Sequence, residues 1–148
     1  MDTYETLNGV LVGLFRDVMD LEQKAIVTSD FPDITNNDMH VIEAIGIDTS
    51  KNMSAIAREL SVTVGTLTIA VNNLVKKGYV VRRRGQKDRR IVYISLSEKG
   101  RRAYEHHAEF HRKMIEGIRS SLSSEEMEVL VKTLKHLDGW FRSFQEEV

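Results

Sequence analysis

The 148-residue sequence contains no cysteine and only one proline, and both shortages limit what the chain can do. Without cysteine, disulfide bonds, thiolate zinc sites and cysteine nucleophiles are excluded. The single proline, Pro32, marks the clearest break in the chain, because proline lacks a backbone donor and ends helices.

Long hydrophobic runs are also missing. The sequence has no stretch of about 20 apolar residues, and its N-terminus lacks the basic start, apolar run and cleavage site of a signal peptide. We therefore expect a soluble, cytoplasmic protein that is not exported.

Motifs that would indicate an enzyme are absent as well. There is no glycine-rich phosphate loop, no Gly-x-Ser-x-Gly and no His-Glu-x-x-His. These absences argue against catalysis. A protein–protein interaction module is an alternative, but it leaves the basic middle of the chain without a role.

The net charge of −1 averages over three very different segments. Residues 1–50 contain 2 Lys/Arg and 10 Asp/Glu, residues 51–102 contain 13 and 3, and residues 103–148 contain 6 and 9. The segment charges are therefore −8, +10 and −3. A basic block between acidic flanks is typical of a phosphate-binding surface, although an isolated charge cluster can also be a solvated face.

The basic block contains two helical patterns joined by a tight turn. The first has Ile56, Ala57 and Leu60 on one face. The second repeats apolar residues at i, i+4, i+7 and i+8, namely Leu67, Val71, Leu74 and Val75. Thr63 is a suitable N-cap for the second helix and Gly78 a suitable C-cap. This spacing predicts a helix-turn-helix.

The outward face of the second helix would carry the side chains that read DNA bases. They are Thr66, Thr68, Ile69, Asn72, Asn73 and Lys76. Residues 79–81 and 91–96 then have strand propensity on either side of the basic residues 82–90. This predicts a β-hairpin with a basic tip, which is a wing.

Amphipathic helical patterns flank this unit. Residues 3–27 form one pattern, and a helix capped at Ser123 forms another that ends in Trp140, Phe141 and Phe144. Their apolar faces are wider than the local chain can cover, so we expect a homodimer. The predicted fold is mainly α with a small β-hairpin (α+β). It comprises an N-terminal dimerisation helix (1–34), a winged helix-turn-helix DNA-binding domain (35–100) and C-terminal helices that complete the dimerisation domain (101–148).

Several motifs resemble the MarR family of dimeric winged-helix transcription regulators. They are LSVT (60–63), GTLT (65–68), LVKKGY (74–79), DRR (88–90) and LSEKG (96–100). Within that family, four stretches are most similar to FabT-type repressors of bacterial fatty-acid synthesis genes: DMH (38–40), TVGTLT (63–68), NNL (72–74) and HAEFHRKM (107–114). The resemblance covers essentially the whole chain and implies a repressor of those genes.

Such a dimer would place its recognition helices in successive major grooves about 34–36 Å apart, on a palindromic operator. Asn72 or Asn73 can pair with adenine, and the methyl groups of Thr66 and Thr68 can meet thymine, which predicts an A·T-rich site. The two threonines can equally contact phosphates.

In the wing, Asp88 and Arg90 lie on the same side of an extended chain and can pair. The resemblance implies that this pairing directs Arg90 into the minor groove, where arginine is attracted to narrow A·T-rich DNA. An ordinary surface salt bridge is the alternative. Phosphate contacts are expected from Lys76, Arg82, Arg83, Arg84, Lys87 and Arg89.

By the same resemblance, a long-chain acyl-acyl-carrier protein acts as co-repressor. Candidate residues for an apolar acyl pocket are Phe15, Met19, Met39, Ile42, Ile45, Phe110 and Met114. Residues of these types at helical spacing are equally compatible with an ordinary core. Because the carrier is acidic, docking needs basic residues, and the candidates are Arg16, Lys24, Arg101 and Arg102.

Other effectors remain open, including a small hydrophobic or phenolic ligand. Zinc is a further alternative, because His107 and His111 are spaced i, i+4 and His40 could join them with Glu22, Glu43 or Glu109. The simpler interpretation is that these histidines are solvated or hydrogen-bonded.

Overall fold

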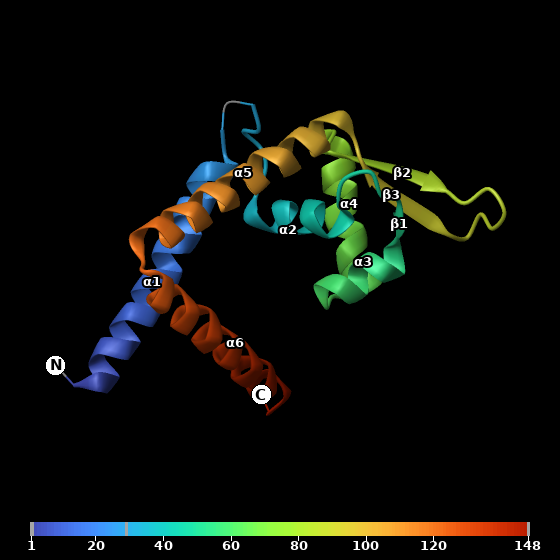
Figure 1. Ribbon diagram of the computed structural model, residues 1–148. Coiled ribbons are helices and arrows are strands. Elements are labelled where there is room, and N and C mark those ends of the chain that lie inside the picture. The colour runs from blue at the N-terminus through green and yellow to red at the C-terminus, as the bar shows by residue number, and fades with distance from the viewer. Residues whose placement is uncertain (1, 29, 148) are drawn as a thin grey trace. The chain divides into compact units, whose positions relative to one another are not determined.

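The structure, a computed structural model, describes residues 2–28 and 30–147. Within them the elements follow in the order α1 (Thr3–Ile26), α2 (Asn36–Ile45), β1 (Lys51–Asn52), α3 (Met53–Leu60), α4 (Val64–Lys77), β2 (Val80–Arg84), β3 (Val92–Leu96), α5 (Glu98–Ser121) and α6 (Ser124–Glu147) (Figure 1). Two compact units divide inside α5, one ending at Phe110 and the other beginning at His111. The mainly α fold with a small antiparallel sheet confirms the predicted fold class.

The pair α3 and α4 forms the helix-turn-helix. The two helices are bent by 106° relative to each other across residues 61–63. Thr63 caps α4, because its hydroxyl oxygen accepts a hydrogen bond from Thr66 N at 3.1 Å. Gly78 ends α4 with φ +86°, a left-handed conformation that favours glycine. Both predicted caps are confirmed.

The core of the first unit lies between α2, α3, α4 and the sheet. It fixes the rotation of α4, because the inward residues Leu67, Val71 and Leu74 are at most 1% exposed. Residues of the other elements in this core include Met39, Ile42, Ile45, Ile56 and Ile94. Burying an apolar side chain of this size stabilises the fold by about 1.5–3 kcal/mol, so turning α4 about its axis is strongly disfavoured.

The sheet has the strand order β1-β3-β2 with antiparallel neighbours. The predicted hairpin is confirmed, with β2 and β3 paired from Val80↔Leu96 to Arg84↔Val92. The third strand, β1, was not predicted. Its two residues are too few to show the alternation by which strands are recognised in a sequence.

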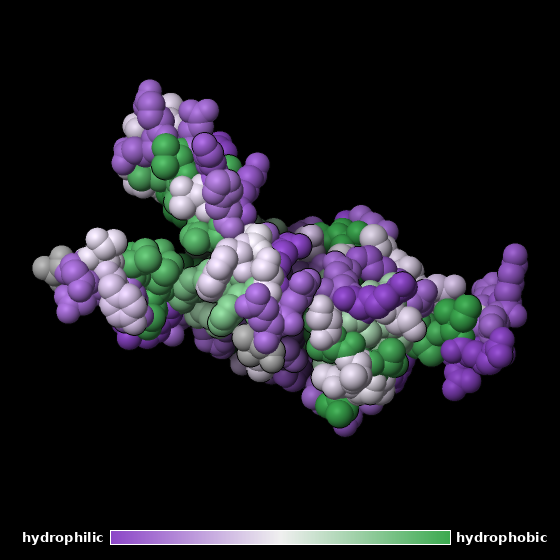
Figure 2. Space-filling view, turned by 90° about the horizontal axis from the view of Figure 1, so that it is seen from below, coloured by the Kyte–Doolittle hydropathy of each residue, from purple (hydrophilic) through white to green (hydrophobic). Residues whose placement is uncertain are grey.

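Helices α1 and α6 carry many apolar side chains that the chain itself does not cover. In α1 only Ile26 is buried, and α6 has no buried residue. The most exposed of these apolar residues include Leu7, Val12, Leu14, Phe15, Val129, Leu134 and Trp140. Figure 2 shows apolar residues, in green, on the surface among hydrophilic ones. None of the helices in the described part of the chain is by itself long and apolar enough to cross a membrane.

Gly100 provides a test of how α5 packs on the winged helix. A Cβ atom at Gly100 would lie 2.0 Å from the Tyr79 carbonyl oxygen, whereas one at Gly117 of the same helix would meet nothing within 4 Å. We expect Gly100→Ala to destabilise the fold by about 1–3 kcal/mol through overpacking. Gly117→Ala should instead stabilise it by about 0.5–1 kcal/mol.

Urea unfolding at one fixed protein concentration measures both changes. Equal midpoints for the two variants would contradict the close approach of α5 to Tyr79.

Candidate nucleic-acid interface

The recognition helix α4 presents a polar face opposite its buried side. Of the six residues predicted to read bases, four are exposed, namely Thr66, Ile69, Asn73 and Lys76. The other two, Thr68 and Asn72, are half-buried. The structure therefore places all six residues at the surface of one helix, as their spacing predicted.

Hydrogen bonds inside α4 already use two threonine hydroxyls. Thr68 Oγ1 donates to the Val64 carbonyl oxygen at 2.8 Å, and Thr66 Oγ1 accepts from the Thr63 hydroxyl at 2.9 Å. A hydroxyl has one proton, so Thr68 cannot donate to a phosphate while this bond is made. Its methyl group can still contact a thymine methyl, so a base contact is favoured over a phosphate contact.

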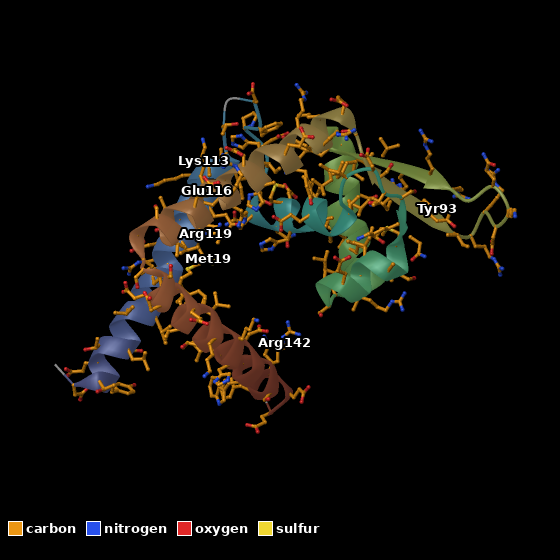
Figure 3. All side chains as sticks on the ribbon, in the orientation of Figure 1. Met19, Tyr93, Lys113, Glu116, Arg119 and Arg142 are labelled. Carbon is orange, nitrogen blue, oxygen red and sulfur yellow. The ribbon has the colours of Figure 1, made fainter. Side chains whose placement is uncertain are left out.

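The wing concentrates positive charge next to α4. Its exposed basic residues are Arg82, Arg83 and Arg84 on β2 and Lys87, Arg89 and Arg90 near the tip. Figure 3 shows the side chains of this hairpin, with Tyr93 of β3 labelled. Because side chains alternate along a strand, Arg82 and Arg84 lie on one face of β2 and Arg83 on the other.

At the wing tip, Asp88 and Arg90 form the expected pair. Arg90 Nε donates to Asp88 Oδ1 at 3.1 Å and Arg90 Nη2 to Oδ2 at 3.0 Å. The Arg90 guanidinium lowers the pKa of the Asp88 carboxyl. The pair does not form on an extended strand as predicted, because Arg90 N also donates to Asp88 Oδ1 and closes an Asx turn.

A groove of about 500 Å³ lies between the helix-turn-helix and the wing. Its lining includes Arg58 from α3, Thr68 from α4, and Arg82 and Arg90 from the wing. At its edge, Arg82 Nη1 donates to Asn72 Oδ1 at 2.5 Å. Recognition helix and wing are therefore joined by a side-chain contact that the sequence spacing did not indicate.

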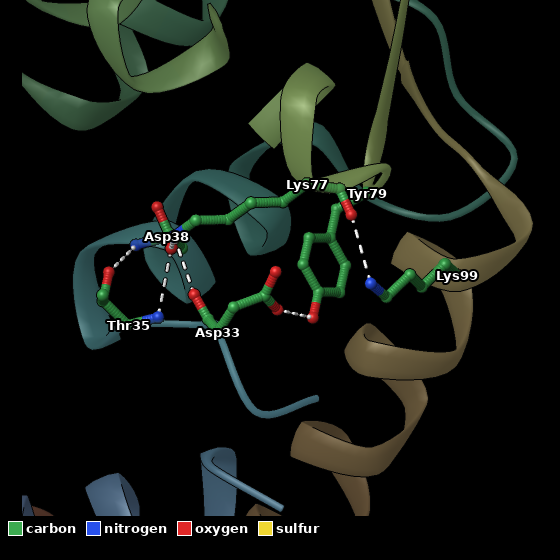
Figure 4. Close-up of polar contacts among 6 residues, drawn as sticks. All are labelled: Asp33, Thr35, Asp38, Lys77, Tyr79 and Lys99. Atoms are coloured by element: carbon green, nitrogen blue, oxygen red, sulfur yellow. Dashed lines mark hydrogen bonds and ion pairs between the residues drawn. The ribbon is translucent and has the colours of Figure 1, made fainter. Parts of the chain in front are cut away.

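Side-chain contacts join the end of α4 to the first turn of α2 and to the segment before it (Figure 4). Lys77 Nζ donates to Asp38 Oδ2 at 2.8 Å and to the Asp33 carbonyl oxygen at 2.7 Å. The Tyr79 hydroxyl donates to Asp33 Oδ1 at 2.7 Å, and Lys99 Nζ lies 4.4 Å from the centre of the Tyr79 ring. These contacts hold the recognition helix at its C-terminal end.

Burial and the hydrogen bond to Asp33 raise the pKa of the Tyr79 phenol above its usual value. The same hydrogen bond lowers the pKa of the Asp33 carboxyl. Tyr79 is fully buried, so this bond orients Asp33 from inside the fold.

The residues expected to line an acyl pocket have different environments. In the first unit, Met39, Ile42 and Ile45 are at most 1% exposed and belong to the core, whereas Phe15 and Met19 are 61% and 52% exposed. These five residues therefore do not form one enclosed pocket, because the inward face of α2 is used for packing. Phe110 and Met114 on α5 are half-buried.

The histidines expected as zinc ligands also differ from one another. His107 on α5 is 2% exposed, and its Nε2 lies 3.2 Å from Glu22 Oε1 and 2.6 Å from Glu43 Oε1. His40 is exposed and lies outside this acidic cluster. Among the described residues, the structure therefore does not bring His40 together with His107, because the His40 side chain is exposed to solvent.

Comparisons with known proteins agree with this geometry. A model of the MarR family matches residues 33–91. The uncharacterized HTH-type transcriptional regulator YwhA of Bacillus subtilis is 34% identical over 55% of this chain and 59% of its own length. The HTH-type transcriptional regulator SarZ of Staphylococcus haemolyticus is 32% identical over 71% of this chain and 70% of its own. Among solved structures, Streptococcus pneumoniae FabT in complex with DNA is 37% identical with a TM-score of 0.88, covering 95% of this chain and 99% of that one.

Substitutions of two residues on the exposed face of α4 test whether base contacts and phosphate contacts come from different side chains. Asn73→Ala should remove a base contact, lower affinity for a preferred site by about 1–3 kcal/mol and relax specificity. Lys76→Ala should weaken binding to all DNA and reduce the salt slope by about one. Fluorescence anisotropy on preferred and random duplexes distinguishes them. Equal losses on both duplexes for both variants would show that the division is wrong.

Tyr79 gives a pH-dependent test of the anchor at the end of α4. Because folding raises its pKa, the stability it adds is complete below its ordinary pKa of about 10 and is lost as pH rises through the raised value. Wild type should therefore lose stability above pH 10 relative to Tyr79→Phe. Parallel pH profiles of the unfolding midpoints would contradict the buried Tyr79–Asp33 bond.

Proposed function

The chain belongs to the MarR family of transcription regulators, and we propose that it represses fatty-acid biosynthesis genes with a long-chain acyl-acyl-carrier protein as co-repressor. The observation that carries this proposal is the likeness to FabT bound to DNA, which extends over nearly the whole chain. The motifs that resemble FabT-type repressors include both the recognition helix and residues 107–114 of α5.

We propose that the protein binds its operator as a homodimer. The exposed apolar faces of α1 and α6 supply surface that a second subunit would cover. A two-fold dimer brings two recognition helices to half-sites about 34–36 Å apart, so the operator would be a pseudo-palindrome.

The acyl chain would bind where apolar residues are still accessible. Phe15 and Met19 meet this condition, and an elongated guest suits the flexible methionine side chain. Because α1 is uncovered along most of its length, we propose that the partner subunit completes this site.

The acidic carrier protein would dock on free basic side chains. Arg101 is a poor candidate, because it is engaged with Asp48 Oδ2 at 3.0 Å and with Glu105 Oε1 at 3.6 Å. Lys24 and Arg102 are exposed and are better placed to meet a negatively charged partner. Arg16 lies 3.9 Å from Asp17, so part of its charge is balanced locally.

A metal is the second candidate effector. Two carboxylate oxygens, from Glu22 and Glu43, converge on the same ring nitrogen of the buried His107. Carboxylate oxygen and imidazole nitrogen are zinc ligands, so a cation could replace the proton at this point. This arrangement supports zinc as the second candidate effector.

The co-repressor is tested by anisotropy titration of a palindromic promoter fragment from a fatty-acid biosynthesis gene under metal-free conditions. We expect long-chain acyl-carrier protein to tighten binding, and unacylated carrier to leave it unchanged. Lys24→Ala combined with Arg102→Ala should reduce the tightening without changing the affinity of the protein alone for DNA.

A DNA affinity that neither the acylated nor the unacylated carrier protein changes would contradict the co-repressor proposal. If added zinc then tightened binding, and Glu22→Gln or Glu43→Gln removed that effect, the effector site would be assigned to His107 instead.

A further inference from the structure

The hydrogen bond between Arg82 and Asn72 determines which atoms of the Asn72 side-chain amide can contact a DNA base. Asn72 lies on the outward side of α4, and Arg82 reaches it from β2, ten residues later. Both belong to the surface that binds DNA in the proposed function, and the inference below rests on that use. Asn73, the neighbouring residue with an amide side chain, is exposed.

The orientation of the Asn72 amide follows from chemistry. Amide oxygen and nitrogen are normally hard to distinguish, and their assignment depends on their partners. A guanidinium has only donors, so the atom that faces Arg82 must be the carbonyl oxygen. The Asn72 NH₂ group is therefore the end left for a base.

This orientation conflicts with the usual pairing of asparagine with adenine. That pairing needs the amide oxygen to accept from adenine N6 while the NH₂ group donates to N7. With Arg82 at the oxygen, the adenine amino group would lie beside a positively charged group of donors. A base whose major-groove edge carries only hydrogen-bond acceptors would not place a donor next to the Arg82 guanidinium.

We infer that Asn72 and Arg82 act together as a pair of donors that reads guanine, so each half-site of the operator contains a required G·C pair. Guanine is the base whose major-groove edge offers two acceptors, N7 and O6. The Asn72 NH₂ group donates to one acceptor, and the guanidinium, which has further N–H groups, supplies the other donor.

The location of the pair supports this role. Arg82 and Thr68 line the groove between helix and wing, and Thr68 lies one helical turn before Asn72. Arg82 is exposed while Asn72 is half-buried, so the guanidinium remains accessible on the side away from the amide. Arg82 is thereby a specificity-determining residue rather than one of several equivalent phosphate contacts.

Selection of binding sites from a random duplex pool tests the inference with three variants. Wild type should prefer guanine over adenine by roughly 3- to 10-fold at one position per half-site, and Asn72→Ala should remove that preference. Arg82→Ala should shift it towards adenine, because the amide oxygen becomes available. Arg83→Ala removes the same charge from the other face of β2 and should keep the guanine preference while weakening binding.

Base analogues at that position give a second, independent measurement. Replacing guanine by 7-deazaguanine removes N7 and should weaken wild-type binding by roughly 3- to 10-fold. Inosine keeps both N7 and O6, so it should bind as guanine does.

An Asn72-dependent preference for adenine in wild type, or identical profiles for Arg82→Ala and Arg83→Ala, would overturn this inference alone. A pool from which wild type enriches no motif, either alone or with long-chain acyl-carrier protein added, would overturn sequence-specific DNA binding as well. Because the pool contains no chosen promoter, a guanine preference can be measured whether or not the protein regulates fatty-acid genes.

Discussion

The burial of one side of α4 is the constraint on which the rest of the DNA surface depends. Leu67, Val71 and Leu74 span two turns of the helix and are almost completely inaccessible to solvent. Rotating α4 would expose them, at a cost of about 1.5–3 kcal/mol for each. The opposite face is therefore fixed, and its polar residues reach solvent together. Tyr79 and Lys77 hold the end of the same helix through Asp33 and Asp38.

The connection between α4 and β2 is short, so the recognition helix and the wing lie next to each other and form a continuous surface. Gly78 ends the helix, and β2 begins at Val80, so Arg82 returns alongside the helix that precedes it. The hydrogen bond from Arg82 to Asn72 then joins the two elements directly. A change at the base of the wing is thereby expected to alter base recognition, even where the wing residue contacts no base.

Local features of this fold were predictable from the sequence, and long-range ones were not. The cap at Thr63, the buried face of α4 and the basic hairpin follow from spacing and residue type, which act over a few residues. The Tyr79–Asp33 and Lys77–Asp38 contacts join residues 46 and 39 positions apart, and no periodicity marks them. The same limit explains why His40 on α2 is exposed and does not join His107 on α5, because no periodicity shows which elements meet in the fold.

The binding of DNA phosphates by the basic middle of the chain is tested most directly by measuring the affinity for duplex DNA as a function of salt concentration. If the basic residues of α4 and the wing neutralise 6–10 phosphates, affinity should fall by roughly 10³- to 10⁵-fold between about 50 and 200 mM salt. An affinity that does not change with salt would contradict the account and favour an interaction module that does not bind DNA.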